Sequence, residues 1–232
     1  MTFLPIYDLT PFTMQDFPNH TACIIWLAGC NMRCAYCHNP QIIKAGSGKK
    51  PLSEIYNFLE KRQCLLDGVV LSGGEATLYQ DIYLLAKKIK NMGYKIKLDT
   101  NGTRPEIVKK LLDEQLVDYI ALDYKAPKNK FYTVTKSHKF IAFSETLSQL
   151  CAQKKIPFEV RTTVHTDLLN EHDLNNIIHD LQMKKYQGTY YIQNFCDAND
   201  RHILGDLPPQ KCEINPELIT NNTAFKIDYR NF

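Results

Sequence analysis

The sequence predicts an α/β fold, an incomplete (β/α)6 TIM-like barrel, and two observations indicate it. Short apolar runs rich in β-branched residues alternate with longer amphipathic stretches from about residue 21 to residue 195. This alternation is typical of parallel strands joined by right-handed crossovers, with helices on the outer face. The chain also has 232 residues, whereas a full barrel of eight units typically needs ~250. Six units fit this length better.

The elements follow one another in a regular order. The expected strands are the apolar runs at 21–27, 68–71, 95–98, 118–122, 158–163 and 189–193. The helix-like segments lie between them, at 52–64, 80–92, 105–115, 141–155 and 171–184. Gly93 and Gly188 follow two of these segments, where C-terminal glycines are expected. We therefore expect a single domain over residues 1–232, with a core at about 18–195 and a C-terminal extension at 196–232.

Composition and charge exclude several classes of function. The chain has 28 Lys and Arg against 25 Asp and Glu, so its charge does not favour nucleic acid as a partner. No apolar run reaches the ~18 residues of a membrane span, and no secretion signal opens the chain. We therefore expect a cytoplasmic protein with no membrane partner. In that reducing compartment, the eight cysteines are expected to be metal ligands, catalytic groups or buried side chains rather than disulfides.

Three cysteines with the spacing C-x3-C-x2-C follow the first predicted strand: Cys30, Cys34 and Cys37. Three thiolates on one loop can bind three corners of a cubane cluster and leave one iron open, whereas ferredoxin-type carriers normally fill all four positions with Cys. Zinc is the main alternative, because Cys3His sites are common and His20 and His38 are nearby. His38 follows Cys37 directly, too close to join the same tetrahedron easily, so the spacing favours a cluster.

The surroundings of these cysteines resemble a known family. The phrases GCNMRC at 29–34 and YCHN at 36–39 are similar to the glycyl-radical-enzyme activating enzymes of the radical S-adenosylmethionine superfamily. The resemblance implies an oxidoreductase with a [4Fe–4S] cluster on the three cysteines and S-adenosylmethionine on the open iron. Tyr36 and His38 would lie beside that cofactor. The implied chemistry is reductive cleavage of S-adenosylmethionine to a 5′-deoxyadenosyl radical, which removes a Cα hydrogen from a glycine of a partner enzyme.

The loop after the second strand, SGGE at 72–75, matches the same family. Gly73 and Gly74 let the backbone come close to a ligand. In the resembled family this Gly-Gly-Glu loop, which ends here at Glu75, receives the methionine amino group of the cofactor. The tripeptide alone is a weak signal, since a tight turn into a helix also explains it. The chain departs from the family at Ala76, where proline is frequent.

Polar residues also follow the third and fourth strands. Asp99 and Thr100 end one strand, and Asp123 and Lys125 follow the next. Ordinary Asx turns would explain them, yet carboxylates after neighbouring barrel strands converge on one mouth. The resemblance implies that Asp99, Thr100 and Asp123 flank a monovalent cation beside the cofactor. It also implies that Lys125 lies near the cofactor carboxylate.

Three further candidates lie on the last two predicted strands and in the segment before the first strand. Arg161 and Gln193, on the fifth and sixth strands, are cofactor-binding candidates, although Arg161 is equally compatible with an exposed strand position. Asn194 replaces Gln193 if the register shifts by one residue. Asp16 lies in segment 13–19, which resembles the part of the activating enzymes that helps to hold the partner's glycine loop. It is a candidate substrate contact, with an ordinary turn as the equal alternative.

The remaining cysteines carry no such pattern. Cys23, Cys64 and Cys151 fall in strand and helix patterns and are expected in the core. Cys196 and Cys212 flank a polar loop without metal-ligand spacing, which disfavours a second cluster, because four compact thiolates would be expected for one.

The resemblance spans about residues 8–195. Within it, the phrases at 65–70, 95–102 and 116–121 are most similar to activating proteins of anaerobic ribonucleoside-triphosphate reductases. The implied partners are therefore that reductase and, as electron donor, flavodoxin or ferredoxin. Three alternatives stay open: an activator of pyruvate formate-lyase or another glycyl radical enzyme, a small-molecule radical enzyme, and a zinc-stabilised interaction protein without enzymatic activity. The sequence indicates neither the oligomeric state nor the role of residues 196–232.

Overall fold

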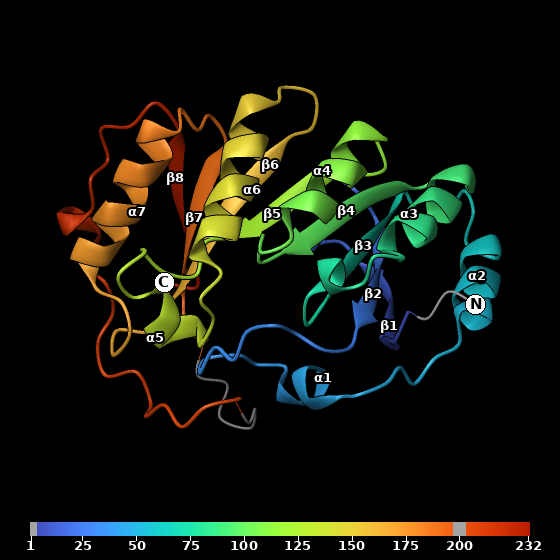
Figure 1. The fold of residues 1–232 in the computed structure, drawn as a ribbon, viewed down its shortest axis with the longest axis horizontal. Coiled ribbons are helices and arrows are strands. Elements are labelled where there is room, and N and C mark those ends of the chain that lie inside the picture. Colours follow the sequence, from blue (N-terminus) through green and yellow to red (C-terminus); the bar gives the residue numbers. More distant parts are fainter. Residues whose placement is uncertain (1–3, 197–202) are drawn as a thin grey trace.

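The computed structural model describes residues 4–196 and 203–232, and its eight strands form one sheet in the order β1 to β8 (Figure 1). The six predicted strands are β2 (Ala22–Leu27), β3 (Gly68–Gly73), β4 (Lys95–Thr100), β5 (Tyr119–Asp123), β6 (Phe158–Val164) and β7 (Thr189–Asn194). Each pairs in parallel with the next. The sheet does not close, because β1 and β8 stand at opposite edges. The predicted α/β fold with an incomplete barrel is confirmed.

The prediction of six strands is wrong, because the sheet has one further strand at each edge. Strand β1 (Ile6–Thr13) pairs antiparallel with β2, and β8 (Lys226–Arg230) pairs in parallel with β7. Both escape sequence analysis because an edge strand is only partly covered and needs no continuous apolar run. Strand β1 contains Asp8 and Pro11, and β8 reads KIDYR; charges and proline are typical of sheet edges.

Five predicted helices are confirmed: α2 (Leu52–Glu60), α3 (Ile82–Asn91), α4 (Pro105–Asp113), α6 (Phe140–Ala152) and α7 (Glu171–Met183). Because every crossover between sequential parallel strands has the same hand, these helices cover one face of the sheet (Figure 1). Two short helices were not predicted, α1 (Pro40–Lys44) and α5 (Phe131–Thr135). Within the described ranges, none of the helices has the length and apolar character that crossing a membrane requires.

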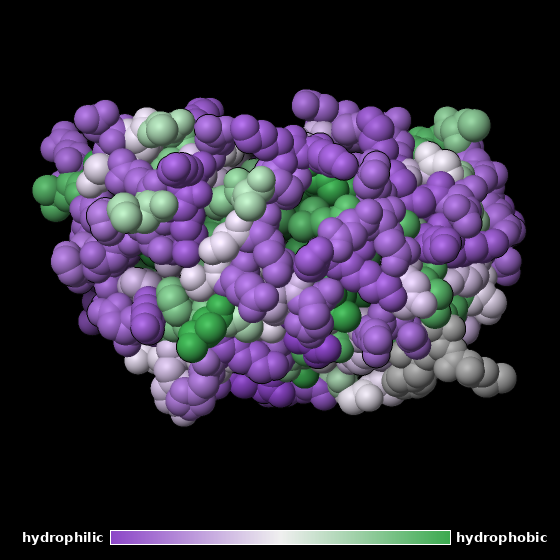
Figure 2. Space-filling model, turned by 45° about the horizontal axis from the view of Figure 1, so that its top comes forward, coloured by the Kyte–Doolittle hydropathy of each residue, from purple (hydrophilic) through white to green (hydrophobic). Residues whose placement is uncertain are grey.

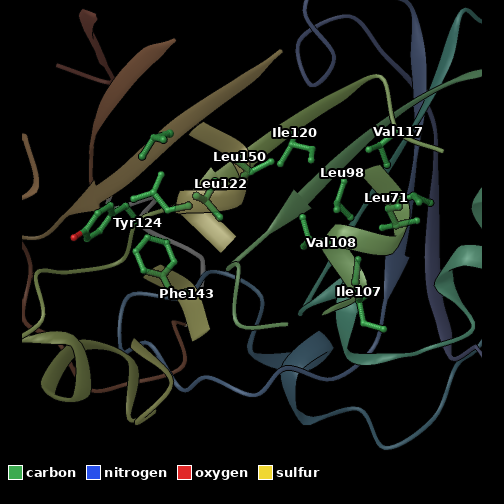
Figure 3. Close-up of a cluster of buried hydrophobic side chains, with 14 of the residues drawn as sticks. Leu71, Leu98, Ile107, Val108, Val117, Ile120, Leu122, Tyr124, Phe143 and Leu150 are labelled. Atoms are coloured by element: carbon green, nitrogen blue, oxygen red, sulfur yellow. The ribbon is translucent and has the colours of Figure 1, made fainter. Parts of the chain in front are cut away.

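The main core lies between the helices and the sheet. Leu71, Leu98 and Leu122 come from neighbouring strands and are fully buried with Val108 of α4 and Phe143 of α6 (Figure 3). The outer side of the helical layer is mostly hydrophilic, with small hydrophobic areas scattered over it (Figure 2). Since side chains alternate along a strand, the residues between these leucines point to the other, concave face.

The concave face is apolar at one end only. Phe17, Ile24 and Val70 form a small buried cluster near the amino ends of the parallel strands. Phe17 packs directly against Gly68, where an added Cβ would lie 2.7 Å from its ring. This cluster fills the amino end of the sheet and leaves the carboxyl end for the polar residues described next.

Candidate functional site

The carboxyl ends of β2 to β6 surround a cavity of about 220 Å³. Parallel strands in sequential order bring all these ends to one edge. The predicted site residues that line the cavity are Cys30, Cys34, Tyr36, Cys37, His38, Gly73, Gly74, Glu75, Asp99, Thr100, Asp123, Lys125 and Arg161. Five separate loops and strand ends therefore contribute to one site.

The loop after β2 carries three thiols into this cavity. Cys34 is buried, and Cys30 and Cys37 are half-buried. Burial and, to a smaller extent, the nearby carboxylate of Glu75 raise the pKa of Cys30 to about 12. Burial also raises the pKa of Cys34, against the opposing effect of Lys125. Without a metal these two thiols are therefore protonated at neutral pH, and metal binding must displace their protons.

The donor set fits an iron–sulfur cluster better than zinc. A tetrahedral zinc ion holds its sulfur ligands at ≈ 2.3 Å around one point. In the described part of the chain, no three His, Cys, Asp or Glu side chains are placed so that they could hold a single metal ion. A cubane cluster binds its thiolates at separate corners. The His38 ring stacks on Phe195 with centroids 5.0 Å apart, in the wall of the same cavity.

Three polar side chains beside the thiols belong to the same wall. The Tyr36 hydroxyl lies near the Cys34 thiol but makes no hydrogen bond of ordinary geometry. The Lys125 ammonium lies 5.8 Å from the centre of the Tyr36 ring. The side chain of Asn101 approaches the Cys30 sulfur to 3.9 Å.

The glycines after β3 are explained by contact between two loops. The amides of Gly74 and Glu75 donate to the carbonyls of Leu27 and Gly29 at 2.9 Å. An added Cβ would lie 2.2 Å from the Leu27 oxygen at Gly73, and 1.9 Å from the Gly29 oxygen at Gly74. From the sequence, the two glycines were expected to allow close approach of a ligand. The structure shows that the neighbouring loop already requires it.

We expect Gly74→Ala to lower the free energy of unfolding by about 3 kcal/mol, because the new methyl group must push the two loops apart. Urea unfolding of the metal-free protein measures the change. Gly46→Ala is the matched control, since a Cβ at Gly46 meets nothing within 4 Å, and it should stay within about 0.5 kcal/mol of the parent. Equal stability of the two variants would show that the loops are not held together.

Glu75 is buried and binds the chain itself rather than the open cavity. One carboxylate oxygen accepts hydrogen bonds from the amide and hydroxyl of Thr77 and from the hydroxyl of Thr100. The other accepts from the amide of Asn101 at 2.6 Å. The Thr100 hydroxyl in turn accepts from the amide of Gly102. Glu75 and Thr100 therefore join the β3 and β4 ends at the edge of the cavity.

The predicted monovalent cation does not fit these residues, because side-chain cations already pair with both carboxylates. Arg161 places Nε and Nη2 3.0 Å from Asp123 Oδ1, and Nη2 also lies 3.9 Å from Asp99 Oδ2. Lys125 Nζ lies 3.0 Å from Asp123 Oδ2. Lys97, whose side chain is only 3% exposed, pairs with Asp99. Each carboxylate thus has two cationic partners.

The charges in this network hold one another in the ionised state. Burial by itself raises the pKa of Asp123, but Arg161 and Lys125 outweigh it and lower the pKa overall. Burial disfavours the charged form of Arg161, but Asp123 and Asp99 outweigh this and raise its pKa. The pKa of Lys125 is raised in the same way, against burial, chiefly by Asp123. The cavity wall is therefore a fixed array of charges at neutral pH.

Two predicted residues lie outside the cavity. Gln193 pairs with Thr163 and Arg230 in the sheet but does not line the cavity wall. Asn194, the alternative, binds the C-terminal segment through Gln210. Asp16 follows β1, whose Thr13 faces Ala22 at the amino end of β2. Six residues of strand β2 span ~20 Å, so Asp16 lies at the end of the sheet opposite the cysteine loop.

Sequence analysis missed several residues of the cavity wall, namely Trp26, Met32, Asn39, Ile43, Ser72, Asn101 and Thr163. Strand alternation could have found Trp26, Ser72 and Thr163, which share a strand face with Ile24, Val70 and Arg161 respectively. The other four lie in loops or in α1, so they depend on how those segments fold.

The cysteines outside the loop differ in burial, and the C-terminal extension contacts the cysteine loop. Cys23 is buried as predicted, but Cys64 is exposed, so its assignment to the core is wrong. It follows the end of α2 with a φ of 64°, in a turn that leaves its side chain in solvent. The extension packs on the cysteine loop, because Leu204 and Gly205 donate their amides to the carbonyls of Cys37 and Ala35 at 2.9 Å.

Comparisons with known proteins agree with this geometry. The family described as the radical SAM superfamily matches residues 24–181. This chain is 32% identical to a Methanocaldococcus jannaschii protein whose name describes it as a glycyl-radical enzyme activating enzyme. The match covers 86% of this chain and 84% of that protein. The pyruvate formate-lyase-activating enzyme of Listeria monocytogenes is 33% identical over 50% of this chain and 52% of its length. Streptococcus suis SuiB bound to S-adenosylmethionine has a similar fold, with a TM-score of 0.65 at 12% identity, over 88% of this chain and 48% of SuiB.

Proposed function

Because the chain belongs to the radical S-adenosylmethionine superfamily and is a homologue of glycyl-radical enzyme activating enzymes, we propose that it installs a glycyl radical in anaerobic ribonucleoside-triphosphate reductase. The observation that carries the proposal is the meeting of three thiols and the Asp123–Lys125 pair in one cavity. The choice of the reductase is supported by the sequence phrases at 65–70, 95–102 and 116–121.

Cys30, Cys34 and Cys37 would hold a [4Fe–4S] cluster with one iron open. When bound there, the cluster and S-adenosylmethionine supply one-electron reductive cleavage to methionine and a 5′-deoxyadenosyl radical, which takes a Cα hydrogen from the partner's glycine. Lys125 presents a partly buried positive charge to the same cavity and would bind the cofactor carboxylate.

The rest of the site positions these groups and keeps water out. Glu75 and the two glycines hold the β3 loop against the cysteine loop. Met32 and Tyr36 are buried in the cavity wall, and such apolar surfaces protect a reactive radical from solvent. The open side of the sheet, between β1 and β8, gives a glycine-bearing loop of a large partner a path to the site.

The proposal is tested by anaerobic incubation of the reconstituted protein with reductant, S-adenosylmethionine and candidate partners. Electron paramagnetic resonance should show a glycyl doublet on anaerobic ribonucleoside-triphosphate reductase and none on pyruvate formate-lyase. A reductase whose radical-bearing glycine is changed to alanine is the matched control and should stay silent. A doublet on another glycyl radical enzyme, with none on the reductase, would contradict the choice of partner.

A further inference from the structure

We infer that a strap in the C-terminal extension holds the second half of the cysteine loop in the arrangement that binds the cluster. The strap consists of residues 203–213. Two positioning residues act through it, Gly205 within the strap and His165 at the end of β6. Figure 1 shows the strap as the orange-red segment along the lower left margin of the molecule. The inference rests on the proposed function in one respect, because it requires a cluster on the three cysteines.

The two halves of the cysteine loop are held by different parts of the chain. In the first half, the Gly29 amide donates to the carbonyl of Ile42 in α1 at 2.9 Å. The Arg33 amide donates to the carbonyl of Thr135, at the end of α5, at 2.8 Å. The second half, residues 34–37, contains two of the three predicted cluster ligands. This half is the part that the strap contacts.

Two main-chain hydrogen bonds join the strap to the second half of the loop. The amide of Leu204 donates to the carbonyl of Cys37, and that of Gly205 donates to Ala35, both at 2.9 Å. Within the described ranges, the main chain of residues 34–37 makes no other main-chain hydrogen bond to a different segment. The strap is therefore the main-chain support of the turn that carries these ligands.

Gly205 allows the strap to approach the loop this closely. An added Cβ at Gly205 would lie 2.6 Å from the Cβ and 2.7 Å from the Cα of Ala35. These atoms cannot swing aside as the end of a long side chain can, so a larger residue must push the strap away from the loop. The glycine thus keeps the two main chains within hydrogen-bonding distance.

A buried imidazole at the end of β6 fixes the other side of the strap. His165 is fully buried and places Nε2 3.0 Å from the carbonyl oxygen of Pro208. Its Nδ1 lies 3.3 Å from the amide nitrogen of Asp167. Because a carbonyl only accepts and an amide N–H only donates, the ring is neutral, carries its proton on Nε2 and donates it to the strap.

Gln210 provides a second anchor at the ends of β6 and β7. Its Nε2 donates to Oδ1 of Asn194, which is buried, at 2.6 Å. Its Oε1 accepts from the amide of Thr166 at 3.2 Å, and the Thr166 hydroxyl donates to the carbonyl of Cys212 at 3.1 Å. Polar residues at these strand ends usually serve a site directly. Here they bind the strap, which indicates that holding the strap is their role.

An aromatic contact connects the same anchor to the cavity. The ring of Phe195 lies between two imidazoles, with its centroid 5.0 Å from that of His38 and 5.0 Å from that of His165. His38 directly follows Cys37 and lines the cavity. The cysteine loop, the end of β7 and the strap are therefore packed as one unit, and a change at His165 reaches the cluster ligands.

The test is the rate at which bathophenanthroline disulfonate removes iron from the anaerobically reconstituted protein, without S-adenosylmethionine or a partner. His165→Phe keeps an aromatic ring beside Phe195 but removes the donor to Pro208. It should lose iron at least about fivefold faster than the parent, because a strap that lacks a buried hydrogen bond opens more often. His165→Gln, which retains an amide donor, should return the rate to within about twofold of the parent. Equal rates in the two variants would overturn the role of the Nε2 proton.

Gly205→Ala tests the strap from its other side and leaves the buried end of β6 intact. It should also accelerate iron loss at least about fivefold. The matched control is Gln182→Ala, which removes the hydrogen bond from Gln182 to the carbonyl of Asn222, near the amino ends of β7 and β8. The control should stay within about twofold of the parent. Iron loss at the parent's rate in Gly205→Ala, or an equal acceleration in the control, overturns the inference.

Hydrogen exchange measures the same coupling in the unchanged protein. Because linkage between two events is reciprocal, a cluster that the docked strap retains must in turn hold the strap in place. The amides of residues 203–213 should therefore exchange more slowly in the cluster-loaded protein than in the metal-free protein, and equal exchange overturns the inference. A parent that binds no iron would overturn the proposed function as well, whereas a stable cluster in both strap variants would overturn this inference alone.

Discussion

Replacement of Cys34 by Ser is expected to abolish cluster binding and the production of 5′-deoxyadenosine. Cys34 is the most buried of the three loop thiols, and a soft thiolate is the ligand that iron–sulfur clusters require. A serine hydroxyl is a hard ligand that resists deprotonation in the same buried position. Iron and sulfide analysis after anaerobic reconstitution, together with chromatography of the nucleoside product, measures both effects.

Cys64→Ser is the matched control for that experiment. Cys64 is exposed and does not line the cavity, so this variant should keep the parent's iron content and its rate of cofactor cleavage. Retained cluster and retained 5′-deoxyadenosine in the Cys34 variant would rule out its role as a ligand. Stoichiometric zinc without iron or sulfide in the parent protein would instead favour a structural zinc site.

Replacement of Arg161 by Met is expected to lower cofactor cleavage by about two orders of magnitude, the size of effect seen when one buried electrostatic partner in an active site is removed. The change leaves Asp99 and Asp123 adjacent without their shared cation. We expect K⁺ or Na⁺ to restore part of the activity of the variant. The parent, in which the guanidinium fills this role, should be indifferent when both ions are replaced by tetramethylammonium. A parent that requires K⁺ would contradict this assignment.

The same substitution should destabilise the fold in a pH-dependent way, by about 3 kcal/mol near pH 7, because it breaks a largely desolvated ion pair. In the parent, the lowered pKa of Asp123 gives stability that is present above the unfolded pKa and is lost as pH falls through the folded pKa. In the variant, burial acts with less opposition and raises that pKa, so protonation relieves the strain as pH falls. Urea unfolding should therefore show a gap that is widest near pH 7 and narrows toward pH 4; a gap independent of pH would count against this linkage.

Much of the candidate site was predictable because its residues stand at strand ends. The order of parallel strands fixes which loops meet, so Cys30, Gly74, Asp123 and Lys125 could be placed in one cavity from their positions alone. The position of Asp16 could not be predicted in this way, because Asp16 follows β1, an antiparallel edge strand that the sequence does not reveal. The direction of β1 decides at which end of the sheet Asp16 lies.

The sequence by itself determined the α/β fold, the cysteine loop and the family, since hydrophobic periodicity and ligand spacing are local properties of a chain. Only the tertiary structure decided what each polar side chain binds. It showed Arg161 between two carboxylates, and Glu75 bound to the amide of Asn101 in a neighbouring loop. Such pairings depend on distances between segments far apart in sequence, and a few ångströms decide whether a charge meets a cofactor, another side chain or solvent.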